Sequence, residues 1–368
     1  MRRATGLALL LAAGVATAQT AHDRSEWPRT DFSRRTVELA EIMSGGPPKD
    51  GIPAIDRPRF VAAPAARDWL RPAEPVIVLR VAGEARAYPL QILMFHEIVN
   101  DTIAGRPVAV TFCPLCNAAM VFERRVGGRT LDFGTTGRLR LSDLVMYDRQ
   151  TESWWQQFTG VGIVGHYAGT RLERLPAEIV SFADFYAAYP RSLVLSRDTG
   201  HARPYGRNPY VGYDDINQSP FLMSAPTDPR LPPMERVLSV SVAGKLRLYP
   251  LSLLERHPVS NRSLGAVPYV VFAKSNMASP LDSPEIADGR RIPAATAFDR
   301  RVADRVLEFA LREGEFVDLA TGSQWNILGE AVAGPLKGER LTALDSGVHF
   351  AFAWLAFNPD SEIVRALP

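Results

Sequence analysis

The chain has 368 residues, 46% of them hydrophobic, and a formal net charge of +2. This length suggests two domains and a sizeable buried core. The near-neutral charge, without a basic stripe interleaved with aromatic residues, argues against a nucleic-acid partner. Two cysteines in a chain of this size do not amount to a disulfide scaffold.

The first 18 residues read as a secretory signal peptide. Two arginines precede an apolar run over residues 7–15, and Ala16-Thr17-Ala18 resembles a cleavage site, so the mature chain would begin near Gln19. No other stretch approaches the roughly 20 apolar residues that a membrane-spanning helix needs. We therefore expect an exported protein, periplasmic or secreted, without a membrane span.

Residues 19–71 are expected to form an extended N-terminal arm. Gly45-Gly46-Pro47-Pro48 and three further prolines break any long element. Within the arm, the apolar spacing of Val37, Leu39 and Ile42 favours one short helix over residues 31–43.

Residues 75–133 have the texture of paired strands. Runs over 76–81 and 84–88 flank Ala82-Gly83 and predict a hairpin. A short helix is expected over 89–95, a buried strand over 108–113, and a second hairpin around Gly127-Gly128. These short spacings favour an α+β fold that is strand-rich and mostly antiparallel.

An internal repeat divides the chain. The sequence of residues 78–90 returns at 240–251, and later matches pair Trp155 with Trp325. We expect two related half-domains from a duplication, at 72–190 and 234–368, joined by a connecting loop at 191–233. The second half-domain lacks cysteines, so the shared fold does not require them.

The two cysteines lie in Cys113-Pro114-Leu115-Cys116, at the end of the buried strand. Pro114 suits the first position of a helical turn, because no backbone donor is needed there. A thiol at a helix N-terminus ionises more easily, and the thiolate attacks disulfides or binds soft metals. Cys113 and Cys116 are therefore candidate catalytic residues.

His96 and Glu97 are candidate partners of the cysteines. His257 occupies the place of His96 in the second half, which favours a structural role. Yet Glu97 and Asp101 flank the histidine only in the first half, where carboxylates can orient the ring and raise its basicity.

The expected substrate pocket is made of polar and aromatic residues of the first half and the connecting loop. Trp155 has a counterpart in the second half and is assigned to the core. Residues 134–143 hold glycines and hydroxyls that suit either a β-turn or an anion-binding loop. The connecting loop, with Tyr205, Tyr210 and Tyr213, is either solvated or a lid over the site. The predicted pocket residues are Asn100, Asp101, Asn117, Ser142, Asp143, Trp154, Gln156 and Tyr210.

The chain resembles an uncharacterised family catalogued as domain of unknown function 3179. The resemblance covers about residues 72–215, and some related proteins are described as selenoproteins, which implies redox chemistry if the selenocysteine lies in this motif. The residues that carry it are Tyr88-Pro89, His96-Glu97-Ile98-Val99-Asn100-Asp101, Phe112-Cys113-Pro114-Leu115-Cys116-Asn117, Phe133-Gly134, Ser142-Asp143-Leu144 and 148–160.

Three functions fit these residues. A thiol redox protein would use Cys113 and Cys116 on a disulfide or peroxide, with a small molecule or a protein thiol as substrate. A metal-binding protein would hold copper or zinc with Cys113, Cys116 and His96, joined by Met120 or His166. A ligand-binding module would use the cysteines as a local clip. Gly-x-Ser-x-Gly and His-Glu-x-x-His motifs are absent, which argues against hydrolases.

Overall fold

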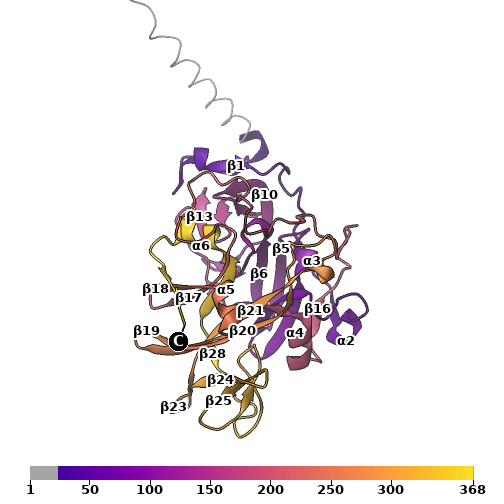
Figure 1. Cartoon of the computed structure of the whole chain (residues 1–368). Coiled ribbons are helices and arrows are strands. Elements are labelled where there is room, and N and C mark those ends of the chain that lie inside the picture. The colour runs from indigo at the N-terminus through magenta and orange to yellow at the C-terminus, as the bar shows by residue number, and fades with distance from the viewer. Residues whose placement is uncertain (1–23, 368) are drawn as a thin grey trace, which may run out of the picture.

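The computed structural model describes residues 24–367, which form a strand-rich, mostly antiparallel α+β fold, as predicted (Figure 1). The proposed signal peptide lies outside the described residues. No helix in the described part of the chain is long and apolar enough to cross a bilayer. The short helices are α2 (Ala63–Ala66), α3 (Leu90–Leu93), α4 (Phe182–Ala188), α5 (Leu251–Arg256), α6 (Ala351–Phe357), and the 3-10 turns η1 (Leu39–Glu41), η2 (Pro114–Cys116) and η3 (Ile286–Asp288).

Three larger sheets and one small ribbon occupy the first half of the chain. In spatial order they are β15 (Ala177–Ser181), β3 (Pro75–Val81), β4 (Glu84–Pro89), β16 (Leu193–Leu195) and β2 (Phe60–Ala62); β14 (Arg174–Leu175), β7 (Ala118–Glu123), β6 (Arg106–Cys113) and β5 (Ile98–Ile103); β1 (Ile42–Ser44), β10 (Phe133–Arg140), β11 (Asp143–Asp148), β12 (Trp154–Gln156) and β13 (Val161–Val164); and β8 (Arg125–Val126) with β9 (Arg129–Thr130).

The second half has sheets of closely similar strand order. They are β29 (Asp345–Phe350), β17 (Arg236–Val242), β18 (Lys245–Pro250) and β30 (Glu362–Ile363); β19 (Val259–Leu264), β20 (Val267–Ala278), β21 (Arg291–Asp299) and β28 (Thr342–Ala343); β24 (Phe309–Arg312), β25 (Glu315–Asp318), β26 (Gln324–Trp325) and β27 (Ala331–Ala333); and β22 (Arg301–Val302) with β23 (Arg305–Val306). In Figure 1 the β10 sheet lies at one end of the molecule and β24 and β25 at the other.

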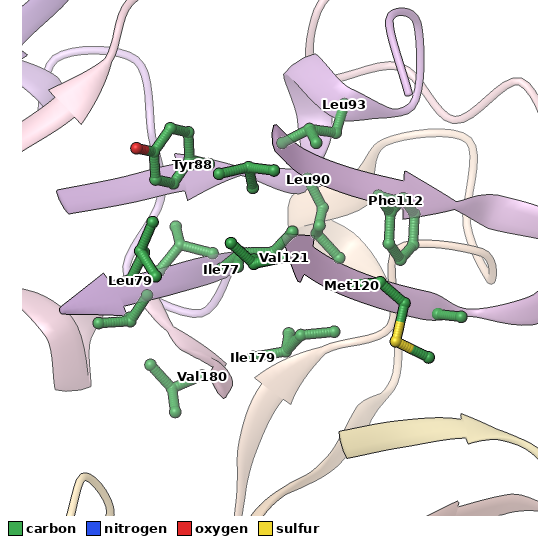
Figure 2. Close-up of a cluster of buried hydrophobic side chains, with 14 of the residues drawn as sticks. Ile77, Leu79, Tyr88, Leu90, Leu93, Phe112, Met120, Val121, Ile179 and Val180 are labelled. Atoms are coloured by element: carbon green, nitrogen blue, oxygen red, sulfur yellow. The ribbon is translucent and has the colours of Figure 1, made fainter. Parts of the chain in front are cut away.

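The predicted hairpins and the cysteine-bearing strand are confirmed. β3 pairs with β4, β6 pairs with both β5 and β7, and α3 follows β4 where the short helix was expected. Because β3 is paired on both sides and covered on both faces, its apolar run from Val76 to Leu79 is fully buried. Figure 2 shows side chains of β3, β4, β6, β7 and β15 gathered in this core.

One apolar core extends through both halves of the chain. Phe112 of β6 and Phe272 of β20 belong to the same cluster of buried hydrophobic residues. Trp155 and Trp325 are also fully buried in it, which confirms Trp155 as a core residue. Each indole nitrogen donates a hydrogen bond to the aspartate seven residues earlier, at 2.9 and 3.1 Å.

The N-terminal arm departs from the expected helix. Only η1 is helical within residues 31–43, and the following residues pair with β10 as β1. Trp27 is fully buried, edge-on to Tyr147 and Trp154 with ring centroids 4.9 and 5.2 Å away. Burial of these aromatic rings therefore outweighs the weak helical spacing of this short segment.

His349 joins the two halves through aromatic contacts. Its ring stacks on Trp354, with centroids 5.4 Å apart, and lies 5.0 Å from Phe158 of the first half. Neither ring nitrogen has a hydrogen-bond partner among the described residues. Burial, with the nearby positive charge of Arg174, sets the pKa of His349 well below its usual value.

We predict that His349 makes the fold sensitive to acid. The unfolded chain takes up a proton near about pH 6.5 while folded His349 stays neutral, so the free energy of unfolding falls as the pH drops below that value. Urea titrations between about pH 7 and pH 5 should show a smaller loss for His349→Leu than for the natural chain. An equal loss in both would contradict this assignment.

Candidate functional site

The cysteines are positioned by a tight turn at the end of β6. Cys113 is still extended, Pro114 begins η2, and Asn117 ends it with a left-handed φ of 49° before β7 starts. This is the short helical turn that the proline predicts. Both thiols are free, and both residues are at least 99% buried.

A second turn, between β10 and β11, faces the cysteines. Leu141 and Ser142 have φ values of 53° and 64°, and the Ser142 carbonyl lies 4.0 and 3.5 Å from the sulfurs of Cys113 and Cys116. Of residues 134–143, where sequence left open a β-turn or an anion-binding loop, 134–140 form a bulged strand and Leu141–Ser142 form the turn.

Asp143 completes the cluster. One carboxylate oxygen of Asp143 and the sulfurs of Cys113 and Cys116 lie within 4.8 Å of one another. Asp143 Oδ2 accepts hydrogen bonds from Gln156 Nε2 at 2.6 Å and from the Phe158 amide at 2.9 Å. Asp143 Oδ1 has no hydrogen-bond partner within the described chain. Burial raises the pKa of this carboxyl to about 7, although its donors oppose the shift.

The thiols do not ionise as easily as the sequence suggested. Burial raises the pKa of Cys113 and raises that of Cys116 further. The expected effect of the helix N-terminus is outweighed because η2 is a single turn inside an apolar core. A hydrogen bond between the thiols lowers the pKa of Cys113 and raises that of Cys116, so Cys113 is the readier nucleophile.

Glu97 adds a second buried carboxyl. It has a left-handed φ of 57°, is 93% buried, and makes no side-chain hydrogen bond to the described residues. Burial, and then the charge of Asp143, raise its pKa to about 8. Glu97 lines a cavity of about 240 Å³ together with Tyr210 and Tyr213 of the connecting segment.

His96 lies apart from this cluster. Its Nδ1 is 2.7 Å from the Pro53 carbonyl and its Nε2 is 2.6 Å from the Tyr205 hydroxyl. Burial lowers the pKa of His96 to about 4. Of the predicted metal set, the structure brings together Cys113 and Cys116 with Asp143, and does not bring His96 to them. His166 is exposed.

The other predicted pocket residues divide into two groups. Gln156 donates to Asp143, and Tyr210 lines the cavity. Trp154 instead packs between Trp27 and Phe32, and Asp101 accepts hydrogen bonds from Tyr88 and Arg86. Asn117 is buried at the end of η2.

Asn100 is a clamp between sheets. Its side chain donates to the Phe133 carbonyl at 2.8 Å and accepts from the Phe133 amide at 3.0 Å, which ties β5 to β10. These bonds hold the open end of the β10–β11 hairpin, where Phe133 pairs with Asp148, and not the end that carries the Ser142–Asp143 turn.

Sequence reasoning missed the apolar residues that enclose the cavity. Leu139, Leu144 and Phe221 have side chains without reactive or polar groups, so nothing in the sequence marked them as lining a pocket. The sequence pointed instead to nearby polar residues, Ser142, Asp143 and Tyr213. The tyrosines of the connecting segment were the available signal: Tyr210 and Tyr213 line the cavity, whereas Tyr205 contacts His96.

The fold and the site define a strand-rich protein with a buried dithiol and carboxyl cluster. The profile of the family described as protein of unknown function DUF3179 matches residues 49–361. The chain belongs to this family, as its motifs suggested. No curated protein and no solved structure matches it.

We predict that Glu97 makes the fold less stable as the pH rises from about 4.5 to about 8. Because folding raises its pKa, the folded state holds the proton over the range from about pH 4.5 to about pH 8, and the free energy of unfolding falls as the pH rises through it. Glu97→Gln should reduce that fall by at least about 1 kcal/mol, since one pKa unit corresponds to about 1.4 kcal/mol. Denaturant titrations at a series of pH values measure the free energy of unfolding of both proteins.

Glu84→Gln, at an exposed carboxylate, is the control and should leave the pH dependence unchanged. A pH dependence in Glu97→Gln identical to that of the natural chain would refute the assignment.

Proposed function

We propose that the protein carries out reversible thiol redox chemistry at Cys113 and Cys116. The observation that carries this proposal is the cluster itself: two free thiols and the Asp143 carboxyl within 4.8 Å of one another, beside a cavity. A dithiol with an adjacent proton acceptor has what disulfide formation requires.

Asp143 is the proposed proton acceptor. A general base works best when its pKa lies near the operating pH, and burial brings the pKa of Asp143 to about 7. Removal of the Cys113 proton gives the attacking thiolate, which the thiol of Cys116 stabilises by its hydrogen bond. The raised thiol pKa values are thus offset by a base held against the sulfurs.

The proposed cycle has two halves. In the first half, a peroxide accepts two electrons and two protons from the thiols, which form a disulfide. An organic hydroperoxide gives one alcohol and one water, and hydrogen peroxide gives two waters. An external dithiol reductant then donates two electrons and two protons to restore the thiols. The closed loop spans about four residues and contributes only roughly 2 kcal/mol of chain entropy, which suits a bond that must be reduced again.

A zinc site is the second candidate. Asp143 Oδ1 is buried without a partner and belongs to a carboxyl that approaches both sulfurs, so a cation would be held by Cys113, Cys116 and Asp143. Two thiolates and a carboxylate suit zinc better than copper(I), which prefers sulfur and imidazole ligands.

We also propose that the two halves arose by duplication and that the protein is exported. The similar strand orders and the paired Trp155 and Trp325 hydrogen bonds support duplication. Ala273 and Asn276 stand where the first half has cysteines, which would confine the redox centre to the first half. The apolar run over residues 7–15 supports export.

We predict a reversible Cys113–Cys116 disulfide. Peroxide treatment followed by mass spectrometry should show the loss of two hydrogens, and a dithiol reductant should restore them. Cys113→Ser should abolish turnover, and Asp143→Asn should slow the oxidation of Cys113 by roughly 100-fold, as expected for loss of a general base. Asp345→Asn, at a 48% exposed carboxylate that pairs with Arg174 and lies outside the cluster, is the control.

Metal analysis of the same preparations separates the two candidates. Stoichiometric zinc that disappears in Cys116→Ser and Asp143→Asn, with no reversible disulfide, would replace the redox proposal by the metal site. Unchanged turnover in Cys113→Ser would reject thiol catalysis.

A further inference from the structure

The cavity beside the dithiol has mainly apolar walls. Ile52, Leu115, Leu139 and Leu144 contribute side chains to it. Its wall also holds an arginine and a glutamate. Arg138 is already engaged by Glu26 and by the ring of Trp154. Burial raises the pKa of Glu97 to about 8, so that its carboxyl is mostly protonated at neutral pH. The cavity therefore favours an uncharged ligand, because an unpaired charge is costly to bury.

The cavity lies next to the redox centre, although Cys113, Cys116 and Asp143 do not themselves line it. Two tyrosines of its wall, Tyr210 and Tyr213, are close enough to interact electrostatically with the thiols. Leu115 stands between the two cysteines in the chain and Leu144 follows Asp143. Glu97, in the same wall, is close enough for its charge to raise the pKa of Cys113. Its carboxyl is more than nine-tenths buried and has no hydrogen-bond partner among the described residues, so it is free to bind a ligand.

The size of the cavity and the burial of the sulfurs exclude a macromolecular oxidant. Cavities of about 150 Å³ already bind benzene, so about 240 Å³ holds a small organic molecule. The sulfurs are at least 99% buried, and a disulfide on a folded protein cannot reach them. Phe221, which lines the cavity and is 49% exposed, marks its mouth.

We propose, building on the thiol redox function above, that this cavity is the substrate chamber for a small uncharged organic hydroperoxide. The apolar walls hold the organic group, and the Glu97 carboxyl hydrogen-bonds the peroxide head and directs it to Cys113.

The chemistry balances within this site. The Cys113 sulfur attacks the terminal hydroxyl oxygen of the hydroperoxide, the O–O bond breaks, and a sulfenic acid forms while the alkoxide takes the proton lost by the thiol and leaves as the alcohol. Cys116 then attacks the sulfenic sulfur, which forms the disulfide and releases water. A charged small disulfide fits this chamber poorly, and hydrogen peroxide leaves the apolar walls uncovered.

The test compares oxidants on the full reduced protein. Stopped-flow oxidation of the dithiol is followed with tert-butyl hydroperoxide, hydrogen peroxide and glutathione disulfide. The organic hydroperoxide should react roughly tenfold faster than hydrogen peroxide, a difference of about 1.4 kcal/mol in the barrier. Glutathione disulfide should react slowest.

Variants with a larger side chain in the cavity test whether its walls cause the preference for an organic hydroperoxide. Ile52→Phe and Leu139→Phe should each slow the organic hydroperoxide by roughly tenfold and hydrogen peroxide by less than about twofold. Glu97→Gln should slow both peroxides. Leu311→Phe, at an exposed leucine of the second half, is the matched control and should change neither rate.

The outcomes separate this inference from the function on which it rests. Three results would contradict the substrate chamber but not the redox centre. They are equal rates for the two peroxides, a faster reaction with glutathione disulfide, and equal slowing of both peroxides in folded variants whose cavity is filled. Failure of every oxidant to form a reversible disulfide would overturn the redox function itself.

Discussion

Contact between two tight turns from different sheets holds the candidate site together. The turn after β6 supplies the sulfurs, and the turn between β10 and β11 supplies the Ser142 carbonyl and the Asp143 carboxyl. Asn100 ties β5 to the start of β10, at the far end of the β10–β11 hairpin from the Asp143 turn. The distance between thiol and carboxyl is therefore set by the packing of the two sheets, and a shift of one sheet against the other would separate the reacting groups.

Burial gives this contact its chemical character. In water the thiols and carboxyls would have ordinary pKa values. Within the core, burial raises the pKa of Asp143 to about 7 and that of Glu97 to about 8, and it also raises the pKa of both thiols. Each of these groups is then neutral more often at physiological pH than it would be in water. The connecting segment contributes Tyr210 and Tyr213 to the wall of the cavity beside the site.

Local signals in the sequence predicted the strands and the turn, whereas contacts distant along the chain were out of reach. The apolar runs predicted β3 and β6, because a short continuous run of β-branched residues is typical of a buried strand. Pro114 predicted η2, because a proline lacks the backbone donor that the first helical position does not need. Asp143 was named as a pocket residue, yet its approach to the sulfurs depends on sheet packing that no local pattern records. His96 was paired with the cysteines for its chemistry, but the left-handed turn at Glu97 directs the glutamate to the site and leaves the histidine against Pro53.

The most direct test is a carbon-13 NMR titration of the Asp143 carboxyl in the reduced and oxidised protein. We expect a pKa of about 7 in the reduced protein and a different pKa once the neighbouring thiols have become a disulfide. A carboxyl that titrates near about 4 in both states would contradict the coupling of Asp143 to the sulfurs on which the account depends.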